Sequence, residues 1–422
     1  MNLINKIFSF SNKKDSKISS FENLKQKKSI KKLFSSIENY SENSEIRYVG
    51  GCIRKILNNE SIDDIDFAVN LKPKECINVL AKNNIKFYET GIDHGTITAV
   101  IENEKFEITS LRKDIKTDGR HAEVVYSKDW HEDASRRDFT INSIYSDLEG
   151  NLYDPYQGKN DIQNGKIQFI GDAEKRIRED YLRILRYVRF FINYSKQPHE
   201  EKIKIIIKKN INGISNISSD RLLDEFKKII KSSGFTRLFE DSFCLEIISL
   251  IFPQFKNIHL LKNFNKYAIE NIKKMDFIFL ISLMIVDGTD NADYFIYKFN
   301  ISKKDQKRIL FLNEYLKNKN NKNFSTKNLW RILYFNGKES LLDLINFHIF
   351  KSKKIDKKLI NFIEFFKDKK VPQLPLKAVT LMTKYNIPEG KDLGLKLKQI
   401  ENKWVDNNFI ISEKEVEKLI ND

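Results

Sequence analysis

Hydrophobic and polar positions alternate in short segments over the first part of the chain and recur at helical spacing over the rest. Between about residues 45 and 169, apolar segments such as "IRYVGG" and "DIDFAVN" are separated by turn residues, which predicts strands. The segment "VIENEKFEI" has a polar centre between apolar flanks and predicts a β-hairpin, and "PKECINVLAKNN" predicts a helix between strands. After Gly171, glycine and proline become sparse, and long segments such as "SDRLLDEFKKIIKSS" predict helices.

These patterns predict an α+β protein, with an α/β head that contains a small mixed sheet and an all-α remainder. The predicted divisions are a basic N-terminal extension at 1–30, a head at 31–171, a helical segment at 172–235, and a helical body and tail at 236–422.

The amino-acid composition indicates which class of partner the chain binds. The chain of 422 residues has 74 Lys+Arg against 58 Asp+Glu, a formal net charge of +16. This surplus favours a polyanionic partner, nucleic acid before a membrane surface, although a lysine-rich composition alone would also produce it. The longest apolar segment, Phe277–Val286, is about half the length that spans a bilayer, so it predicts a core helix and no membrane partner.

The cysteines and the N-terminal segment predict a cytoplasmic location. Cys52, Cys76 and Cys244 are far apart and form no CxxC motif, which fits a reduced cytosolic chain and argues against a cysteine-ligated zinc site. The N-terminal segment has no sustained apolar region or small-residue cleavage site, so secretion is not expected.

Two carboxylates, Asp64 and Asp66, lie in the predicted strand Ile62–Val69. Side chains at positions i and i+2 of a strand point to the same side, where two carboxylates repel unless a cation lies between them. Mg²⁺ prefers such ligands and keeps positions open for water and phosphate, so the pair predicts a magnesium site for phosphoryl chemistry. An isolated Asp-x-Asp pair is more often a solvated turn. Glu107 is a candidate third ligand, although an outward-facing hairpin glutamate is an equal alternative.

The segment "YVGGCIR" supports the catalytic interpretation. Gly50 and Gly51 directly follow an apolar strand, where backbone N–H groups can approach a triphosphate closely. Arg54 follows at a reach suited to phosphate oxygens. A strand-to-helix turn with an exposed arginine would give the same letters, but Gly-Gly-x-x-Arg shortly before Asp-x-Asp is rarely met by chance.

These motifs, together with "RRDFTINSIY" and "REDYLRILRYVRFF", resemble the class II tRNA nucleotidyltransferase and poly(A) polymerase family, above all its bacterial CCA-adding branch. The resemblance extends from about Tyr48 to Lys231. It implies a nucleotidyltransferase head, a helical neck that selects the base, and an RNA-binding body and tail. It also implies that Asp64 and Asp66 bind Mg²⁺.

The resemblance further assigns residues to the incoming nucleotide. They are Gly51, Arg54, Arg137 and Asn142, with Arg136 as a further candidate. One departure from the family pattern is Lys55, which stands where the family usually has an aspartate after the motif arginine. That carboxylate is therefore not available to orient Arg54 or Arg137.

A predicted helix from Glu179 to Arg189 brings Asp180 and Arg183 together, because residues three apart on a helix are neighbours. Cytosine and adenine both present an amino donor beside a ring-nitrogen acceptor, which a carboxylate and a guanidinium can pair with. Uracil and guanine present the reverse order and would leave buried charges unpaired. A core helix with ordinary ion pairs is the alternative. The resemblance implies that Asp180 and Arg183 select the nucleotide, with Arg186 and Arg189 in support; Glu179 is a further candidate.

Two later segments complete the expectations. The glycine, mixed charges and lack of periodicity of Asp114–Val125 predict a mobile loop, which the family uses when it adds the final A. Arg221 and Glu225 are expected to form an ion pair within one helix.

The sequence therefore predicts Mg²⁺-dependent, template-independent addition of CCA to the 3′ end of tRNA from CTP and ATP, with the helical body holding the acceptor and T arms. Poly(A) or A-only addition shares the base-selecting motif and stays open. A non-enzymatic RNA-binding protein is a third hypothesis, which the intact Asp64/Asp66 and Asp180/Arg183 pairs disfavour.

Overall fold

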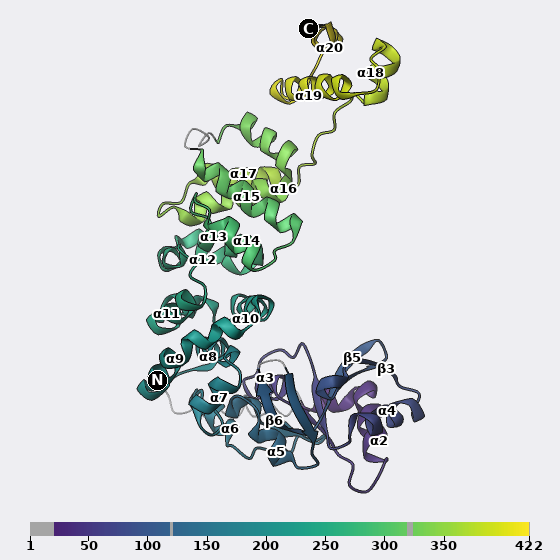
Figure 1. The fold of residues 1–422 in the computed structure, drawn as a ribbon, viewed down its shortest axis with the longest axis vertical. Coiled ribbons are helices and arrows are strands. Elements are labelled where there is room, and N and C mark those ends of the chain that lie inside the picture. The colour runs from purple at the N-terminus through teal and green to yellow at the C-terminus, as the bar shows by residue number, and fades with distance from the viewer. Residues whose placement is uncertain (1–20, 119–120, 319–323, 422) are drawn as a thin grey trace, which may run out of the picture. The chain divides into compact units, whose positions relative to one another are not determined.

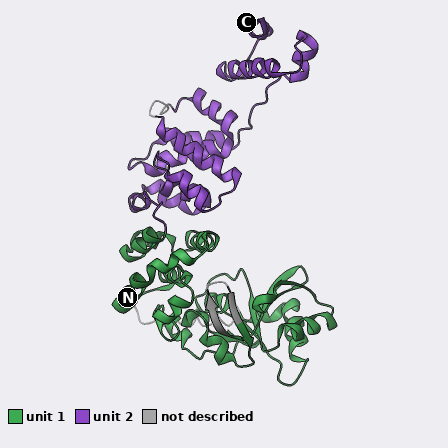
Figure 2. Ribbon diagram, in the orientation of Figure 1, with its two compact units in different colours: residues 1–251 green, residues 252–422 purple. Residues whose placement is uncertain are grey.

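The computed structural model describes residues 21–118, 121–318 and 324–421, with backbone alone at 114–118 and 121–123 (Figure 1). The chain divides into two compact units, residues 1–251 and 252–422 (Figure 2). The first contains the sheet and the second is helical, so the predicted α+β fold class is confirmed. The finer four-part division stays a prediction. Residues 21–30 of the expected basic extension are mostly helical, with Leu24 and Ile30 buried.

The head is built on a mixed sheet with the order β3-β4-β5-β2-β1-β8-β9, in which only the pair β2–β5 is parallel. The strands of this sheet are β1 Ile46–Val49, β2 Asp66–Val69, β3 Lys86–Gly91, β4 Thr96–Ile101, β5 Glu104–Ser110, β8 Tyr145–Ser146 and β9 Leu152–Tyr153. The predicted hairpin is β4–β5, and its turn residues Glu102 and Asn103 both have positive φ, as a tight two-residue hairpin turn requires.

Two sequence predictions about strands are wrong. The strand expected over Ile62–Val69 begins only at Asp66, because its partner β1 ends at Val49, directly before the glycine turn. Asp64 therefore lies in the loop before β2. The loop expected at Asp114–Val125 is instead an antiparallel pair, β6 Arg112–Asp118 and β7 His121–Tyr126. Its β-branched residues suit strands, and its charges obscured that pattern. Residues 119–120 lie outside the described residues.

Helices surround the sheet and continue into the neck. In the first unit they are α2 Lys28–Glu38, α3 Gly51–Leu57, α4 Pro73–Lys82, α5 Trp130–Ser135, α6 Gly158–Asn164, α7 Ala173–Glu179, α8 Leu182–Tyr194, α9 Glu201–Asn210, α10 Ser219–Lys231 and α11 Ser242–Ile251. Short 3-10 turns lie at Ile92–His94, Thr140–Asn142, Ile211–Asn216 and Phe235–Phe239.

The second unit is a helical array. Its helices are α12 Lys266–Asn271, α13 Phe277–Ile285, α14 Asn291–Lys298, α15 Lys303–Lys317, α16 Thr326–Lys351, α17 Lys357–Lys367, α18 Ala378–Tyr385, α19 Lys391–Asp406 and α20 Glu413–Asn421, with 3-10 turns at Ile258–Asn263 and Ile272–Lys274. Most of α13 is buried, which confirms the predicted core helix. None of the described helices is long and apolar enough to cross a membrane.

The predicted continuous helix around Asp180 is two helices. α7 ends at Glu179, Asp180 is extended, and α8 begins at Leu182. The Asp180 carboxylate accepts a hydrogen bond from the Leu182 amide at 3.2 Å, so this side chain satisfies one of the free amides at the start of α8. The Asp180 side chain therefore does not lie on the face of a helix.

The core of the head is a group of aromatic rings on the face of the sheet that α2 covers. Phe67 of β2 is fully buried, and its ring centroid lies 5.7 Å from that of Phe34 in α2, 5.1 Å from that of Tyr48 and 5.8 Å from that of Phe106. The contacts with Phe34 and Phe106 are edge-to-face, and such contacts stabilise the core beyond the burial of apolar area. They fix β2, and with it the start of the strand at Asp66.

Replacement of Phe67 by alanine is expected to lower the free energy of unfolding by about 3–5 kcal/mol, because it leaves a cavity among three rings. Urea denaturation followed by circular dichroism measures this change. Tyr40→Ala, at a side chain that is 46% exposed, is the control and should change stability little. Equal effects of the two substitutions would contradict the assigned core.

Candidate active site

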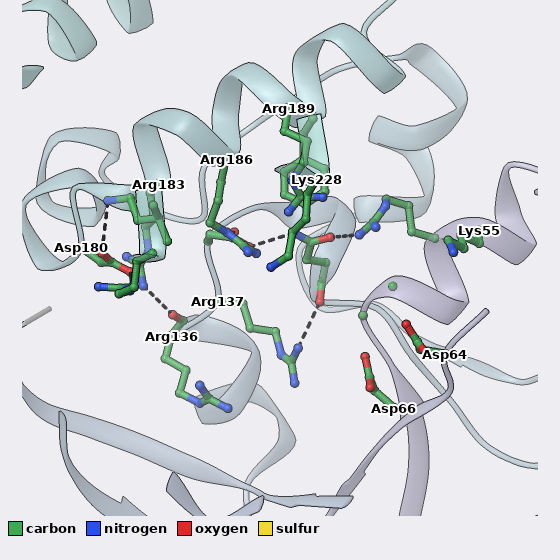
Figure 3. Close-up of a pocket in the computed structure, with 18 residues that line it drawn as sticks. Lys55, Asp64, Asp66, Arg136, Arg137, Asp180, Arg183, Arg186, Arg189 and Lys228 are labelled. Atoms are coloured by element: carbon green, nitrogen blue, oxygen red, sulfur yellow. Dashed lines mark hydrogen bonds and ion pairs between the residues drawn. The ribbon is translucent and has the colours of Figure 1, made fainter. Parts of the chain in front are cut away.

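A cavity of about 600 Å³ in the first unit brings most of the predicted residues together (Figure 3). Its lining includes nine Lys or Arg and four Asp residues, so its electrostatic character suits a polyanionic ligand. The predicted residues in the lining are Gly50, Gly51, Arg54, Asp64, Asp66, Arg136, Arg137, Asn142, Asp180, Arg183, Arg186 and Arg189. Glu107 and Glu179 are not part of it.

Asp64 and Asp66 point into the same end of the cavity (Figure 3). The loop before β2 supplies the first carboxylate and the first residue of β2 the second, so they converge although they do not share a strand. Glu107 lies beside them on β5, where it is the register partner of Asp66, and is exposed. Burial, followed by the charges of Glu107 and Asp64, raises the pKa of Asp66 to about 6.

This acidic pair fits a divalent cation. The donors are carboxylate oxygens, and the charge of Asp64 disfavours ionisation of Asp66, a cost that a cation would remove. Asp64 and Asp66 are therefore the residues that would hold the ion. Asp63, the third acid of the run, is largely exposed and pairs with Lys55 at 2.6 Å.

The glycine turn is fixed by its backbone. Gly50 has a φ of 72°, a conformation that strains any residue with a side chain, and a Cβ there would lie 3.7 Å from Nη1 of Arg137. Arg54 of α3 donates a hydrogen bond to the Asn142 side chain. Its Nε is buried without an acceptor among the described residues, and a buried donor of this kind favours an incoming acceptor such as phosphate.

Asp133 holds the two arginines of the "RRD" motif. Its carboxylate is 2.7 Å from Nη2 of Arg136 and 3.0 Å from Nη2 of Arg137, and it accepts a 2.7 Å hydrogen bond from the Tyr145 hydroxyl. Burial acts to raise the pKa of Asp133, but Arg137 and then Arg136 outweigh it and hold the pKa well below its usual range. Orientation of Arg137 therefore does not depend on the aspartate that Lys55 replaces.

Asp138 links the neck to the glycine turn. One of its oxygens accepts a 2.6 Å hydrogen bond from Arg186 of α8, and the other accepts a 2.9 Å hydrogen bond from Asn142, which in turn binds Arg54. Burial opposes ionisation of Asp138, but Arg186 outweighs it and holds the pKa well below its usual range. A continuous hydrogen-bonded chain thus runs from α8 to α3.

The far end of the cavity contains Asp180 and Arg183 (Figure 3). Arg221 of α10 donates to Asp180 at 2.8 Å, and Arg183 donates to Glu179 at 2.7 Å. The predicted pair Arg221–Glu225 is wrong: Glu225 is buried and binds Arg189 of α8 at 2.5 Å. The partner of Arg221 thus lies between α7 and α8, and that of Glu225 lies on α8.

Comparisons with known proteins identify the head. Residues 46–168 match the family model described as poly A polymerase head domain, and residues 200–258 match that described as probable RNA and SrmB- binding site of polymerase A. The mitochondrial CCA tRNA nucleotidyltransferase 1 of Mus musculus is 37% identical over 68% of this chain and 65% of its own length. The CCA-adding enzyme of Lactobacillus johnsonii is 36% identical over 46% of this chain and 48% of its own length.

Two segments of the chain are therefore similar to poly(A) polymerases, and the chain is similar to tRNA nucleotidyltransferases over longer stretches. It spans 46% to 65% of the length of the first three curated relatives it matches. Similarity of fold extends over nearly the whole chain: a crystal structure of the Bacillus stearothermophilus CCA-adding enzyme in complex with CTP aligns with 94% of this chain and 98% of its own, with a TM-score of 0.71 and 21% identity.

Sequence reasoning missed several residues of this site. Asp133 and Asp138 orient the predicted side chains, and Arg221, Lys228 and Phe190 line the cavity. A signal for Asp133 was present, because it lies three and four residues before Arg136 and Arg137 at the end of α5. Arg221 and Lys228 had no such signal, since their place depends on how α10 packs against α8.

The raised pKa of Asp66 predicts that Asp66→Asn stabilises the fold. Because the folded pKa is about 6 and the unfolded value is about 4, the ionised side chain destabilises the fold above pH 6. In EDTA at pH 7.5 the variant should gain on the order of 1–3 kcal/mol in free energy of unfolding.

The gain should shrink as the pH falls from 6 towards 4, where both folded and unfolded wild-type chains become protonated at this position. Urea denaturation at a series of pH values measures it. A gain that does not depend on pH would show that charge is not its cause. Asp63→Asn, at an exposed acid, is the control.

Proposed function

We propose that this chain is an Mg²⁺-dependent nucleotidyltransferase that adds CCA to the 3′ end of tRNA from CTP and ATP without a nucleic-acid template. The observation that carries the proposal is one cavity with the acidic pair at one end and Asp180 with Arg183 at the other, joined by arginines. A nucleoside triphosphate needs this order of groups: base readers, phosphate binders and a metal site. The names of the curated relatives support the same reaction.

In the proposed reaction the 3′ hydroxyl of the RNA attacks the α-phosphate, a new P–O bond forms, and the bond to pyrophosphate breaks. Mg²⁺ held by Asp64 and Asp66 would supply electrostatic stabilisation of the developing charge. Arg54 and the backbone amide of Gly51 bind phosphate oxygens. Arg137, held in place by Asp133, contacts the phosphate or ribose. Asn142 positions Arg54 through its side-chain oxygen.

Base selection rests on Asp180 and Arg183. The carboxylate accepts from the exocyclic amino group of cytosine or adenine, and the guanidinium donates to the adjacent ring nitrogen. Protein partners already bind both side chains, Arg221 on Asp180 and Glu179 on Arg183, and so hold them in defined orientations. Arg186 and Arg189 brace the same helix through Asp138 and Glu225.

The lysine-rich second unit is the surface we assign to the acceptor and T arms of tRNA. Phosphate contacts by Lys and Arg make such binding weaken steeply with salt. We place the reaction in the cytoplasm, although the mouse relative is named as a mitochondrial enzyme. Poly(A) or A-only addition is the second candidate, favoured by the description of the head-domain model, and use of CTP distinguishes it from CCA addition.

The central test is incorporation of CTP and ATP into tRNA transcripts that lack one, two or three 3′ nucleotides. The wild-type chain should add C, C and A in order. Asp64→Ala should lower the rate by about a thousandfold or more, because it removes a metal ligand. The matched control Asp63→Ala, at the neighbouring exposed acid, should retain most activity. ATP incorporation without use of CTP would exclude CCA addition, and unchanged activity of Asp64→Ala would exclude the assigned metal site.

A second test concerns selectivity. Asp180→Ala should reduce the ratio of kcat/KM for CTP over UTP by roughly tenfold to a thousandfold, because the mismatched uracil no longer faces a half-buried carboxylate. Arg183→Ala should act in the same direction. The control is Arg178→Ala, at a largely exposed arginine of α7 that pairs with Glu174. Proportional loss of CTP and UTP use in all three variants would show that Asp180 and Arg183 do not read the base.

A further inference from the structure

A cluster of three potential metal ligands lies in the first unit, outside the residues that line the cavity. His199 precedes α9, Asp241 directly precedes α11, and Cys244 lies in the first turn of α11. Among the residues that the structure describes, these three form the one group of His, Cys, Asp and Glu side chains whose ligand atoms all lie within 4.8 Å of one another. The proposed function uses none of them.

The distances within the cluster match a shared ion. Nε2 of His199 lies 3.1 Å from each oxygen of Asp241 and 3.8 Å from Sγ of Cys244. Ligand atoms on a tetrahedral zinc ion, at bonds of about 2.0–2.3 Å, are about 3.4–3.6 Å apart. Cys244 is fully buried, and the Asp241 side chain, 25% exposed, gives access from solvent.

The polar groups of the cluster converge on one another. A carboxylate and a thiol both face Nε2 of His199, and the Cys244 thiol also hydrogen-bonds to Asp241. A catalytic Cys-His-Asp triad would need the carboxylate on the other ring nitrogen. That nitrogen, Nδ1, lies 2.9 Å from the Tyr187 hydroxyl. A partner on the second nitrogen is the usual way in which a metal-binding histidine is oriented.

The surroundings also suit an ion. The His199 ring is stacked on Phe191 with centroids 3.5 Å apart and meets the edge of Phe243, so its in-plane nitrogens are held in direction. One oxygen of Asp241 caps α11 by accepting from the Cys244 amide at 2.8 Å, which leaves the second oxygen for a metal. A thiolate and a carboxylate together neutralise a divalent ion, so the loaded site would bury no net charge.

We propose that His199, Asp241 and Cys244 bind a zinc ion that fastens the start of α11 to the segment between α8 and α9, where His199 packs against Tyr187 and Phe191 of α8. The ligand set of imidazole, thiolate and carboxylate is typical of zinc, and the open fourth position takes water. Binding displaces the thiol proton of Cys244 to solvent. The sequence expectation against a cysteine-ligated zinc site considered only pairs of cysteines, whereas here the other ligands are a histidine and an aspartate.

The test uses Co²⁺ as a spectroscopic probe on the full chain, in excess Mg²⁺ so that Asp64 and Asp66 are occupied. One equivalent of Co²⁺ should produce a thiolate-to-cobalt charge-transfer band, and one equivalent of Zn²⁺ should remove it and raise the melting temperature by several degrees. Cys244→Ala should abolish the band. Cys76→Ala, at an equally buried cysteine of α4, should retain it.

Asp241→Asn provides a variant that keeps its fold, because asparagine caps a helix as well as aspartate does. It should weaken Co²⁺ binding by at least tenfold. The proposal is overturned if the wild-type chain gives no charge-transfer band at micromolar Co²⁺, or if the band survives in Cys244→Ala. In either case the cluster is a hydrogen-bonded brace of α11 only. Neither result bears on CTP and ATP incorporation, which tests the proposed function separately.

Discussion

The geometry of the cavity depends on the two hydrogen bonds that the buried carboxylate of Asp138 accepts. This carboxylate joins Arg186 of α8 to Asn142, and Asn142 joins Arg54 of α3. The helix proposed to read the base and the turn proposed to bind phosphate are therefore connected through one charged group. Removal of one partner from such a group is costly, because it leaves an unpaired charge in a buried place. This cost keeps the two ends of the cavity in a fixed relation.

The electrostatic surroundings of the acidic pair, Asp64 and Asp66, are opposite to those of Asp138. Asp133 and Asp138 face guanidiniums, and their pKa values lie well below the usual range despite burial. Asp66 faces Glu107 and Asp64, and its pKa is raised to about 6. At this site, Asp133 and Asp138 are paired with guanidinium groups of the protein, whereas Asp66 lies beside other carboxylates. That contrast separates side chains that hold the structure from those available to a cation.

The fold class, the hairpin β4–β5 and most of the cavity residues were predictable from the sequence. Local periodicity sufficed for the elements, and the resemblance carried residue roles across short motifs. What could not be predicted depends on partners distant in the chain. The strand start at Asp66 is set by the end of β1, and the pairs Arg221–Asp180 and Glu225–Arg189 are set by packing of α10 against α8. Spacing within one segment contains no information about either.

The break between α7 and α8 shows how a local irregularity can serve selection of a base. Were Asp180 in a continuous helix, its carboxylate would lie along the helix surface beside Arg183. As an extended residue it caps α8 and binds Arg221, so its direction is set from two sides. A carboxylate held in this way discriminates by orientation as well as by charge, because a base with the wrong pairing edge cannot draw it into a new position. Under the proposed function, the rigidity of the neck is thus part of what replaces a template strand.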